Sequence, residues 1–379
     1  MRMLPNEEQT ILKRSAQEFF QARSPVKALR ALRDARDANG FDRALWRDMA
    51  DLGWAGILVP EAYGGAAFGY KGLGQVLEEA GRTLVASPLV ATALIGAPLL
   101  AASASEAQRE TLLPAVATGE SLLTLAIDEL PRHAPTHIAT RASADGAGYR
   151  LSGSKTFVLD GHVADWFIVV ARTAGGMDDV DGISLFLVAA GAPGITCSRT
   201  PMVDSRNAAT LRFDNVALGA DALLGTAGQG QTLLEPVLDG ARIGLAAEML
   251  GSGQEAFDRT LAYLKLRRQF DQPIGAFQAL KHRAALMYCE LELTRSAVLE
   301  ALGALDEGRR SVAMLASLAK AKACDMFELV SAEAVQMHGG IGMTDAEEIV
   351  FFLKRARVAQ QLFGDAVFHR ARYATLAGF

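Results

Sequence analysis

The sequence has few cysteines, and they are not arranged as a redox or zinc motif. Only three occur among 379 residues, at Cys197, Cys289 and Cys324, and none lies in a CxxC pair. An odd number of widely spaced thiols argues against a disulfide framework or a structural zinc site. We therefore expect three unpaired packing thiols, no metal centre and a reducing, cytoplasmic location.

Basic runs and long apolar runs are also scarce. The net charge is −5 and Lys and Arg do not cluster, which argues against nucleic acid as the main partner. The most apolar window, residues 84–102, is interrupted by two prolines and two hydroxyl side chains, so it predicts a buried helix and no membrane span. The first fifteen residues carry early acids and lack the apolar core of a secretory signal.

The chain lacks the glycine motif of nicotinamide-binding proteins. No strand-like segment is followed by GxGxxG and a helix, so a Rossmann unit is not expected. Residues 225–230 are rich in glycine, but their spacing is wrong and they indicate a loop into the next helix.

Apolar spacing divides the chain into three parts. Residues 1–118 and 229–379 carry apolar side chains at helical spacing, whereas 119–228 contain short strand-like runs separated by turn residues. The sequence predicts an α+β protein with an N-terminal all-α domain, a middle β-domain and a C-terminal four-helix bundle. The helices expected in the last part are 233–251, 252–266, 277–305, 311–338 and 345–377.

The most informative segment is RRQFDQPIGAFQ, residues 267–278. Arginine offers a rigid fork of donors that suits phosphate oxygens. Gln269 and Gln278 supply further polar groups, and Phe270 can lie against a flat ring. These side chains suit a phosphate-bearing aromatic ligand. The alternative is an exposed helix end with solvated arginines.

A second cluster, QMHGGIG, occupies residues 336–342. Its three glycines end a helix and allow a ligand to approach the backbone closely, although a simple helix cap would need the same residues. His338 has no carboxylate or second histidine at ligand spacing, so we interpret it as structural.

These two clusters resemble the acyl-CoA dehydrogenase signatures R-x-Q-F-G-x-P-I-x-x-F-Q and Q-x-x-G-G-x-G, with Asp271 in place of the first glycine. In that family they hold the adenine and pyrophosphate half of FAD across a subunit interface. The resemblance implies FAD as cofactor, an acyl-CoA thioester as substrate, a tetramer and electron-transfer flavoprotein as electron acceptor. It assigns cofactor binding to Arg267, Gln269, Phe270, Ile274, Phe277, Gln278, Gln336, Gly339 and Gly340.

The middle part departs from the family on the side that contacts the flavin ring. The threonine–glutamate loop ending in G-S-D is not kept in residues 125–135. The family triplet W-I-T or W-I-S falls on residues 157–159, where the side chain of Leu159 cannot donate a hydrogen bond.

The family's catalytic base is missing from both of its usual positions. Desaturation needs a carboxylate to take the α-proton while the β-hydrogen leaves as hydride. The resemblance places Phe363 and Ala241 where that carboxylate would be. Asp239, three residues before Arg242, is the candidate replacement, and a surface or helix-capping acid is the alternative. Asp365 matches a cofactor-contacting threonine, where an anion would be unfavourable unless neutralised.

This combination resembles the accessory (beta, or small) subunit of bacterial heterotetrameric acyl-CoA dehydrogenases. We therefore expect a subunit for α,β-desaturation of an acyl-CoA, from fatty acid or steroid side-chain β-oxidation, that supplies the adenine side of FAD to a catalytic partner. The alternatives are a self-sufficient homotetrameric dehydrogenase that uses Asp239 and a catalytically silent scaffold.

Overall fold

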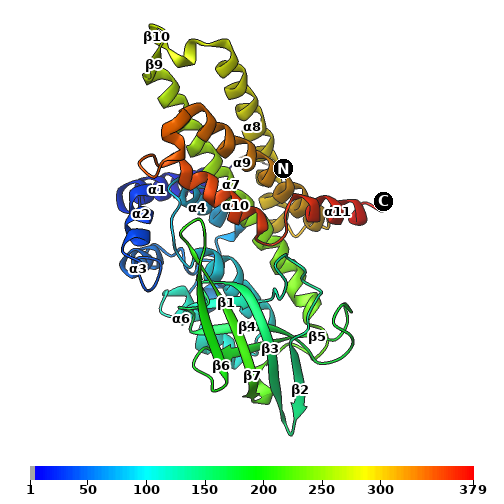
Figure 1. Ribbon diagram of the computed structural model, residues 1–379. Coiled ribbons are helices and arrows are strands. Elements are labelled where there is room, and N and C mark those ends of the chain that lie inside the picture. The colour runs from blue at the N-terminus through cyan, green and yellow to red at the C-terminus, as the bar shows by residue number, and fades with distance from the viewer. Residues whose placement is uncertain (1–4) are drawn as a thin grey trace. The chain divides into compact units, whose positions relative to one another are not determined.

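The computed structural model describes residues 5–379, and its elements follow the expected order of helices, strands and helices (Figure 1). Residues 1–4, part of the segment judged above to lack a secretory signal, lie outside the described residues. The first part contains α1 (Glu7–Arg23), α2 (Val26–Asp34), α3 (Arg43–Asp51), η1 (Glu61–Tyr63), α4 (Gly69–Arg82), η2 (Leu89–Gly96), α5 (Ala97–Ser103) and α6 (Glu106–Ala117).

The apolar window 84–102 is buried inside the fold. Its residues 89–96 form the π-helix η2, which continues directly into α5, and every residue of η2 is buried. The prediction of a buried helix is therefore confirmed for this part of the window. In the described part of the chain, no helix is both long and apolar enough to cross a membrane.

The middle part is a mixed sheet with strand order β6-β7-β3-β2-β4-β5-β8, and β1 pairs in parallel with β4. Four of these strands, β3, β4, β5 and β7, contain the predicted strand-like runs, and β1, β2, β6 and β8 were not predicted. The strands are β1 (Leu123–Ala126), β2 (Arg141–Asp145), β3 (Gly148–Leu159), β4 (Trp166–Arg172), β5 (Ile183–Ala189), β6 (Ile195–Pro201), β7 (Asn207–Leu218) and β8 (Leu223–Leu224), with η3 (Ala220–Ala222) before β8.

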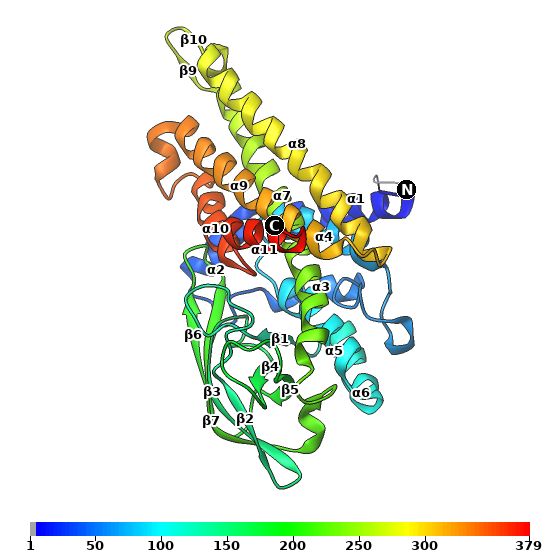
Figure 2. The same cartoon turned by 90° about the vertical axis from the view of Figure 1, so that its right-hand side faces the viewer.

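The last part is helical, and α9 packs against α8, α10 and α11. Figures 1 and 2 show α7 and α8 running beside each other to the hairpin that joins them. The elements are α7 (Gly230–Leu266), β9 (Arg268–Gln269), β10 (Gln272–Pro273), η4 (Ile274–Ala276), α8 (Gln278–Asp306), α9 (Val312–His338), η5 (Gly339–Met343), α10 (Ile349–Gln361) and α11 (Ala366–Leu376).

Two helix boundaries in this part differ from the prediction. The expected break between residues 251 and 252 is wrong, because α7 runs without interruption through both glycines of that region, Gly251 and Gly253. The single helix expected over 345–377 is also wrong. It is divided into α10 and α11, because Phe363 and Gly364 adopt φ angles of 57° and 102° that no helix contains.

The residues form two compact units. One combines the chain up to Ala35 with residues 70–85 and 242–379, and the other combines residues 36–69 and 86–241. The N-terminal helical part thus contributes to both units, and the domain boundaries at 118 and 228 stay a prediction.

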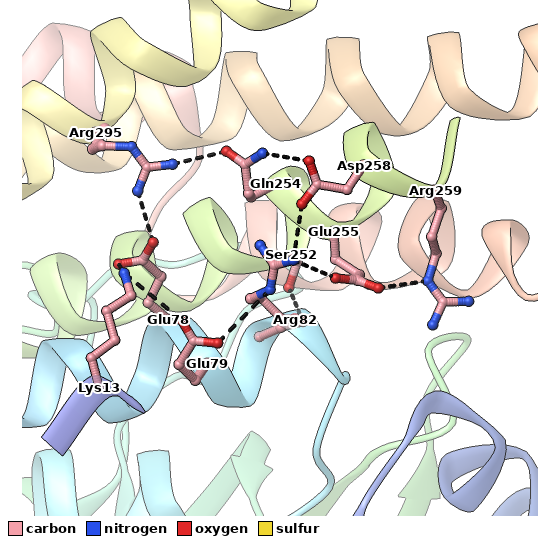
Figure 3. Close-up of polar contacts among 11 residues, drawn as sticks. Lys13, Glu78, Glu79, Arg82, Ser252, Gln254, Glu255, Asp258, Arg259 and Arg295 are labelled. Carbon is pink, nitrogen blue, oxygen red and sulfur yellow. Dashed lines mark hydrogen bonds and ion pairs between the residues drawn. The ribbon is translucent and has the colours of Figure 1, made fainter. Parts of the chain in front are cut away.

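A network of ion pairs ties α7 to its neighbours in the first unit (Figure 3). The carboxylate of Glu78, on α4, lies 2.6 Å from Lys13 Nζ and 2.8 Å from Arg295 Nη1. Burial favours its protonated form, but Lys13 and Arg295 hold the pKa of Glu78 below its usual value. Arg82, also on α4, binds Glu255 and Asp258 of α7 at 2.8 and 2.9 Å. The middle of α7 is therefore fixed before the helix reaches the hairpin.

All three thiols are free, as predicted, but only one of them packs inside the protein. Cys324 is buried, whereas Cys197 and Cys289 are exposed. The expectation of three packing thiols is therefore wrong for those two, since Cys197 lies on the exposed strand β6 and Cys289 on an outer face of α8.

Candidate functional site

The segment 267–278 is an exposed hairpin at the far end of α7 (Figure 2). Strands β9 and β10 pair Gln269 with Gln272, and the two residues between them, Phe270 and Asp271, have φ angles of 53° and 62°. Two-residue turns with both φ angles positive favour Gly, Asn and Asp. Asp271 is thus compatible with the turn, although glycine stands there in the family signature.

We expect Asp271→Gly to stabilise the chain by about 0.5 kcal/mol, because glycine reaches a positive φ without the steric cost that an L side chain carries. Urea unfolding followed by circular dichroism measures the change. Gln272→Gly is the matched control in the paired strand and should destabilise by about 0.5–1 kcal/mol. Equal losses of stability in both variants would show that the turn conformation does not favour glycine at residue 271.

The hairpin side chains assigned to cofactor binding lie at the surface. Arg267, Gln269 and Gln278 are exposed, and Phe270 is 83% exposed. The ring of Phe270 meets Phe277 edge to face at 6.0 Å, which holds an aromatic surface beside the arginines. Ile274 and Phe277 are half-buried. These exposed groups can bind an anionic aromatic ligand.

The glycines of residues 336–342 have two different roles. A Cβ atom at Gly339 or Gly340 would meet no heavy atom within 4 Å, so the backbone there faces open space. A Cβ at Gly342 would lie 2.7 Å from the carbonyl oxygen of Val335, so this glycine is needed for packing. Gln336, Gly339 and Gly340 are exposed. The open side of the two glycines fits a ligand that approaches the backbone closely.

The two clusters are joined by an aromatic contact that the sequence did not predict. Tyr263, on α7, stacks on His338 with ring centroids 4.4 Å apart and an interplanar angle of 25°. The Tyr263 hydroxyl donates to the His338 carbonyl oxygen at 3.2 Å, and His338 Nδ1 lies 2.7 Å from the Ala334 carbonyl oxygen. These contacts support the structural interpretation of His338. The only sequence signal for Tyr263 is its place one helical turn before Arg267.

The acids of the loop 125–135 hold the loop itself. Glu129 accepts from the buried Lys155 Nζ at 2.6 Å and from the backbone N–H of Ala139 at 2.6 Å. Burial lowers the pKa of Lys155 to about 8 even though Glu129 opposes the shift. Asp128 lies 3.0 Å from His133 Nδ1. Both carboxylates of this loop therefore have structural partners.

The triplet 157–159 lies at an irregular point of β3. The pairing with β7 shifts register between Lys155 and Val158, and Phe157 has a φ of 57°. The carbonyl oxygen of Leu159 accepts a 2.6 Å hydrogen bond from Thr124. Its aliphatic side chain is half-buried and adds no donor at this position.

Neither position of the family base carries a proton acceptor. Phe363 is 6% exposed and Ala241 is fully buried. Asp239 is 4% exposed and lies inside α7, so the alternative of a surface or helix-capping acid is wrong; its role as a base stays a prediction. Asp365 caps α11 by accepting the Phe368 N–H at 2.8 Å, which gives this carboxylate a structural role.

Two buried side chains pin the loop that carries Phe363. Lys320, on α9, donates to the carbonyl oxygens of Gly364 at 2.9 Å and Ala359 at 3.1 Å. His369 Nε2 donates to the Phe363 carbonyl oxygen at 3.0 Å. Burial, together with the charges of Lys320 and Arg242, lowers the pKa of His369 to about 2, so its ring is neutral. Lys320 did not stand out in the sequence.

Among the residues that the structure describes, no three His, Cys, Asp or Glu side chains gather as a metal site would require. The candidate site therefore has two parts. One is an exposed surface, on the hairpin and on the glycine loop (residues 339–342), that suits an anionic aromatic ligand. The other is the pair of apolar side chains, Phe363 and Ala241, at the two positions of the family base.

Comparison with known proteins finds family models that match most of the chain. Models of the acyl-CoA dehydrogenase N-terminal, middle and C-terminal domains match residues 6–120, 133–216 and 228–375. The probable acyl-CoA dehydrogenase YngJ of Bacillus subtilis is 31% identical over 327 residues, which cover 84% of this chain and 86% of that protein. FadE12 of Mycobacterium tuberculosis is 31% identical over 83% of both chains.

Several solved structures share the fold over nearly their full length. A variant of the steroid ACAD Tcur3481-Tcur3483 has a TM-score of 0.88 and 33% identity, with 98% of both chains covered. The ChsE4-ChsE5 complex of Mycobacterium tuberculosis and butyryl-CoA dehydrogenase of Megasphaera elsdenii each have a TM-score of 0.90 and 26% identity, with 100% of both chains covered.

Proposed function

This chain belongs to the acyl-CoA dehydrogenase family and has its fold, and we propose that it supplies the adenine and pyrophosphate half of an FAD site to a catalytic partner subunit. FAD is the cofactor of the family. The observation that carries the proposal is that most residues assigned to cofactor binding are exposed on a chain that has Phe363 and Ala241 at the two positions of the family base.

The chain's own residues fit the diphosphate and adenine end of FAD. Arg267 can present its guanidinium to phosphate oxygens, Phe270 offers an aromatic face, and Gly339 and Gly340 leave the backbone open to a ligand. We assign supporting contacts to Gln269, Ile274, Phe277, Gln278 and Gln336. Bound FAD would supply the hydride acceptor for desaturation. Because most of these groups are exposed, we propose that a second subunit covers the bound ligand.

Proton abstraction is the step that this chain is least equipped to perform. A positioned general base increases the rate of such a reaction by about 10²–10⁴-fold. A phenyl ring or a methyl group cannot take a proton, and Asp128, Glu129 and Asp365 already hold structural contacts. The partner subunit is therefore the proposed source of the base and of the flavin-ring contacts.

The proposed substrate is an acyl-CoA thioester, and electron-transfer flavoprotein is the proposed electron acceptor. Two of the similar structures are named for two components, which supports a heterotetramer over a homotetramer. One of these two is named as a steroid enzyme, so acyl groups of fatty acid or steroid side-chain β-oxidation are both proposed. We keep the cytoplasmic location as part of the proposal.

The test is to purify the chain alone and with the acyl-CoA dehydrogenase encoded beside its gene. Native mass spectrometry then reports stoichiometry and FAD content together, and an acyl-CoA oxidation assay reports turnover. We expect FAD retention and turnover only in the complex, and loss of FAD from an intact complex that carries Arg267→Gln. Strong FAD retention and turnover by the lone chain would overturn the proposal.

A second candidate is a self-sufficient homotetramer that uses Asp239 as its base. The observation in its favour is that Asp239 is buried on α7, three residues before Arg242. Asp239→Asn should then abolish reduction of the flavin by substrate in a single turnover, and an unchanged rate would reject this candidate. A purely structural scaffold is the remaining alternative, and a yellow purified complex that loses its FAD with Arg267→Gln would count against it.

A further inference from the structure

One face of α7 contacts the root of each cofactor-binding segment. Arg259 and Tyr263 are four residues apart and lie along one side of α7, and Arg267 directly follows the last residue of the helix. Arg259 Nη1 binds the Glu348 carboxylate at 2.8 Å, beyond the glycine loop. Tyr263 contacts His338, directly before that loop. The same helix face therefore contacts the chain on both sides of the glycine loop, at His338 before it and at Glu348, the first residue before α10, after it.

Tyr263 also supports the base of the hairpin. Its carbonyl oxygen accepts the Arg267 N–H at 2.8 Å, and the Arg267 carbonyl in turn accepts the Ile274 N–H at 2.8 Å. The backbone of Tyr263 thus hydrogen-bonds to the base of the hairpin, whereas its side chain contacts His338 at the end of α9.

The contacts to His338 fix both the position and the direction of the helix end. The last carbonyl groups of a helix have no partner within the helix. The Tyr263 hydroxyl satisfies the one on His338, just where Gly339 turns the chain with a φ of 67°. The stacked rings prevent sideways movement, and the bond from His338 to Ala334 fixes the imidazole plane.

We propose that Tyr263 and His338 are positioning residues that hold the Arg267 hairpin and the Gly339–Gly340 loop at the spacing required by one nucleotide diphosphate. The proposal rests on the function proposed above. A ligand that spans two segments binds tightly only if their separation is set before it arrives, because otherwise binding has to order them. Tyr263 sets that separation through its contacts with His338.

The test measures the FAD affinity of the complex, by equilibrium dialysis, for variants of this chain. Tyr263→Ala removes the stacking and the hydrogen bond, and we expect the Kd to rise about tenfold. Tyr263→Phe keeps the stacked ring and should raise it about threefold. His338→Phe should keep most of the affinity that His338→Ala loses. Tyr63→Phe is the matched control, since it removes a tyrosine hydroxyl bond, to Glu106 at 2.7 Å, in the other compact unit.

A double-mutant cycle with Arg267→Gln separates positioning from general destabilisation. If the Tyr263 side chain acts by holding the Gly339–Gly340 loop where one ligand can reach both segments, the loss caused by Arg267→Gln will be smaller in the Tyr263→Ala background. Additive losses, or unchanged affinity in Tyr263→Ala while Arg267→Gln weakens binding, would overturn the positioning role alone. If Arg267→Gln leaves the FAD affinity unchanged, or if no complex binds FAD, the proposed function fails and this inference fails with it.

Discussion

Gly251→Ala should destabilise the protein by about 3 kcal/mol, even though alanine is about 1 kcal/mol better than glycine inside a helix. A Cβ at Gly251 would lie 1.7 Å from the Glu78 carbonyl oxygen and 2.6 Å from its carbon, both backbone atoms of α4. Backbone atoms in a packed helix cannot rotate away as a side chain can. The added methyl group therefore has to separate α4 from α7.

The crossing of these helices is close on both sides. A Cβ at Gly81, on α4, would lie 2.1 Å from the Glu248 carbonyl oxygen of α7. Ser252 Oγ donates to the Gly81 carbonyl oxygen at 2.9 Å, which ties the two backbones together. Separating the helices would break this bond and strain the ion pairs that Glu78 and Arg82 make beside it (Figure 3).

Gly253→Ala, two residues further along α7, is the matched control. Its Cβ would lie 2.6 Å from the sulfur of Met326, the flexible end of a side chain that can move. We expect a change within about 1 kcal/mol of zero, because the gain in helix propensity offsets the adjustment. Urea unfolding followed by circular dichroism gives both free energies. Equal losses in the two variants would show that the contact with α4 does not require glycine.

The same glycines explain why a helix break was predicted between residues 251 and 252, where α7 is continuous. Gly251 followed by Ser252 is typical of a helix end, because glycine favours turns when only local structure is considered. In the fold, a neighbouring helix needs the space that a side chain would fill. Such a tertiary reason leaves no local pattern, so the type of structure in residues 233–266 was predicted but its continuity was not.

The candidate site likewise contains residues that could be predicted from the sequence and residues that could not. The motif residues of the hairpin and the glycine loop could be named from the sequence, because their spacing along the chain matches the two family signatures. The residues that hold them could not. Tyr263 meets His338 across a large sequence separation, and Lys320 reaches Gly364 in the same way. Asp271 was noted as a departure from the family, and its positive φ explains why a short acidic residue is accepted there.

His369→Gln should make the protein more tolerant of acid. The folded-state pKa of His369 is about 2, lowered by burial and by Lys320 and Arg242, whereas the unfolded value is about 6.5. Between these values the unfolded chain binds the proton and the folded chain does not, so stability rises with pH across the window and falls as the pH drops below 6.5. Lowering the pH from 7 to 5 should therefore cost about 2 kcal/mol through this histidine alone.

Glutamine keeps a donor for the Phe363 carbonyl oxygen but does not titrate, so the variant should lose about 2 kcal/mol less between pH 7 and pH 5 than the unmodified protein. Urea unfolding at the two pH values measures the difference. His282→Gln, at an exposed histidine on α8, is the control and should leave the pH dependence unchanged. An unchanged dependence in His369→Gln would mean that His369 is not held neutral. The loop at the family's base position would then depend on Lys320 for its conformation, and Phe363 would lie beside a histidine able to carry a proton.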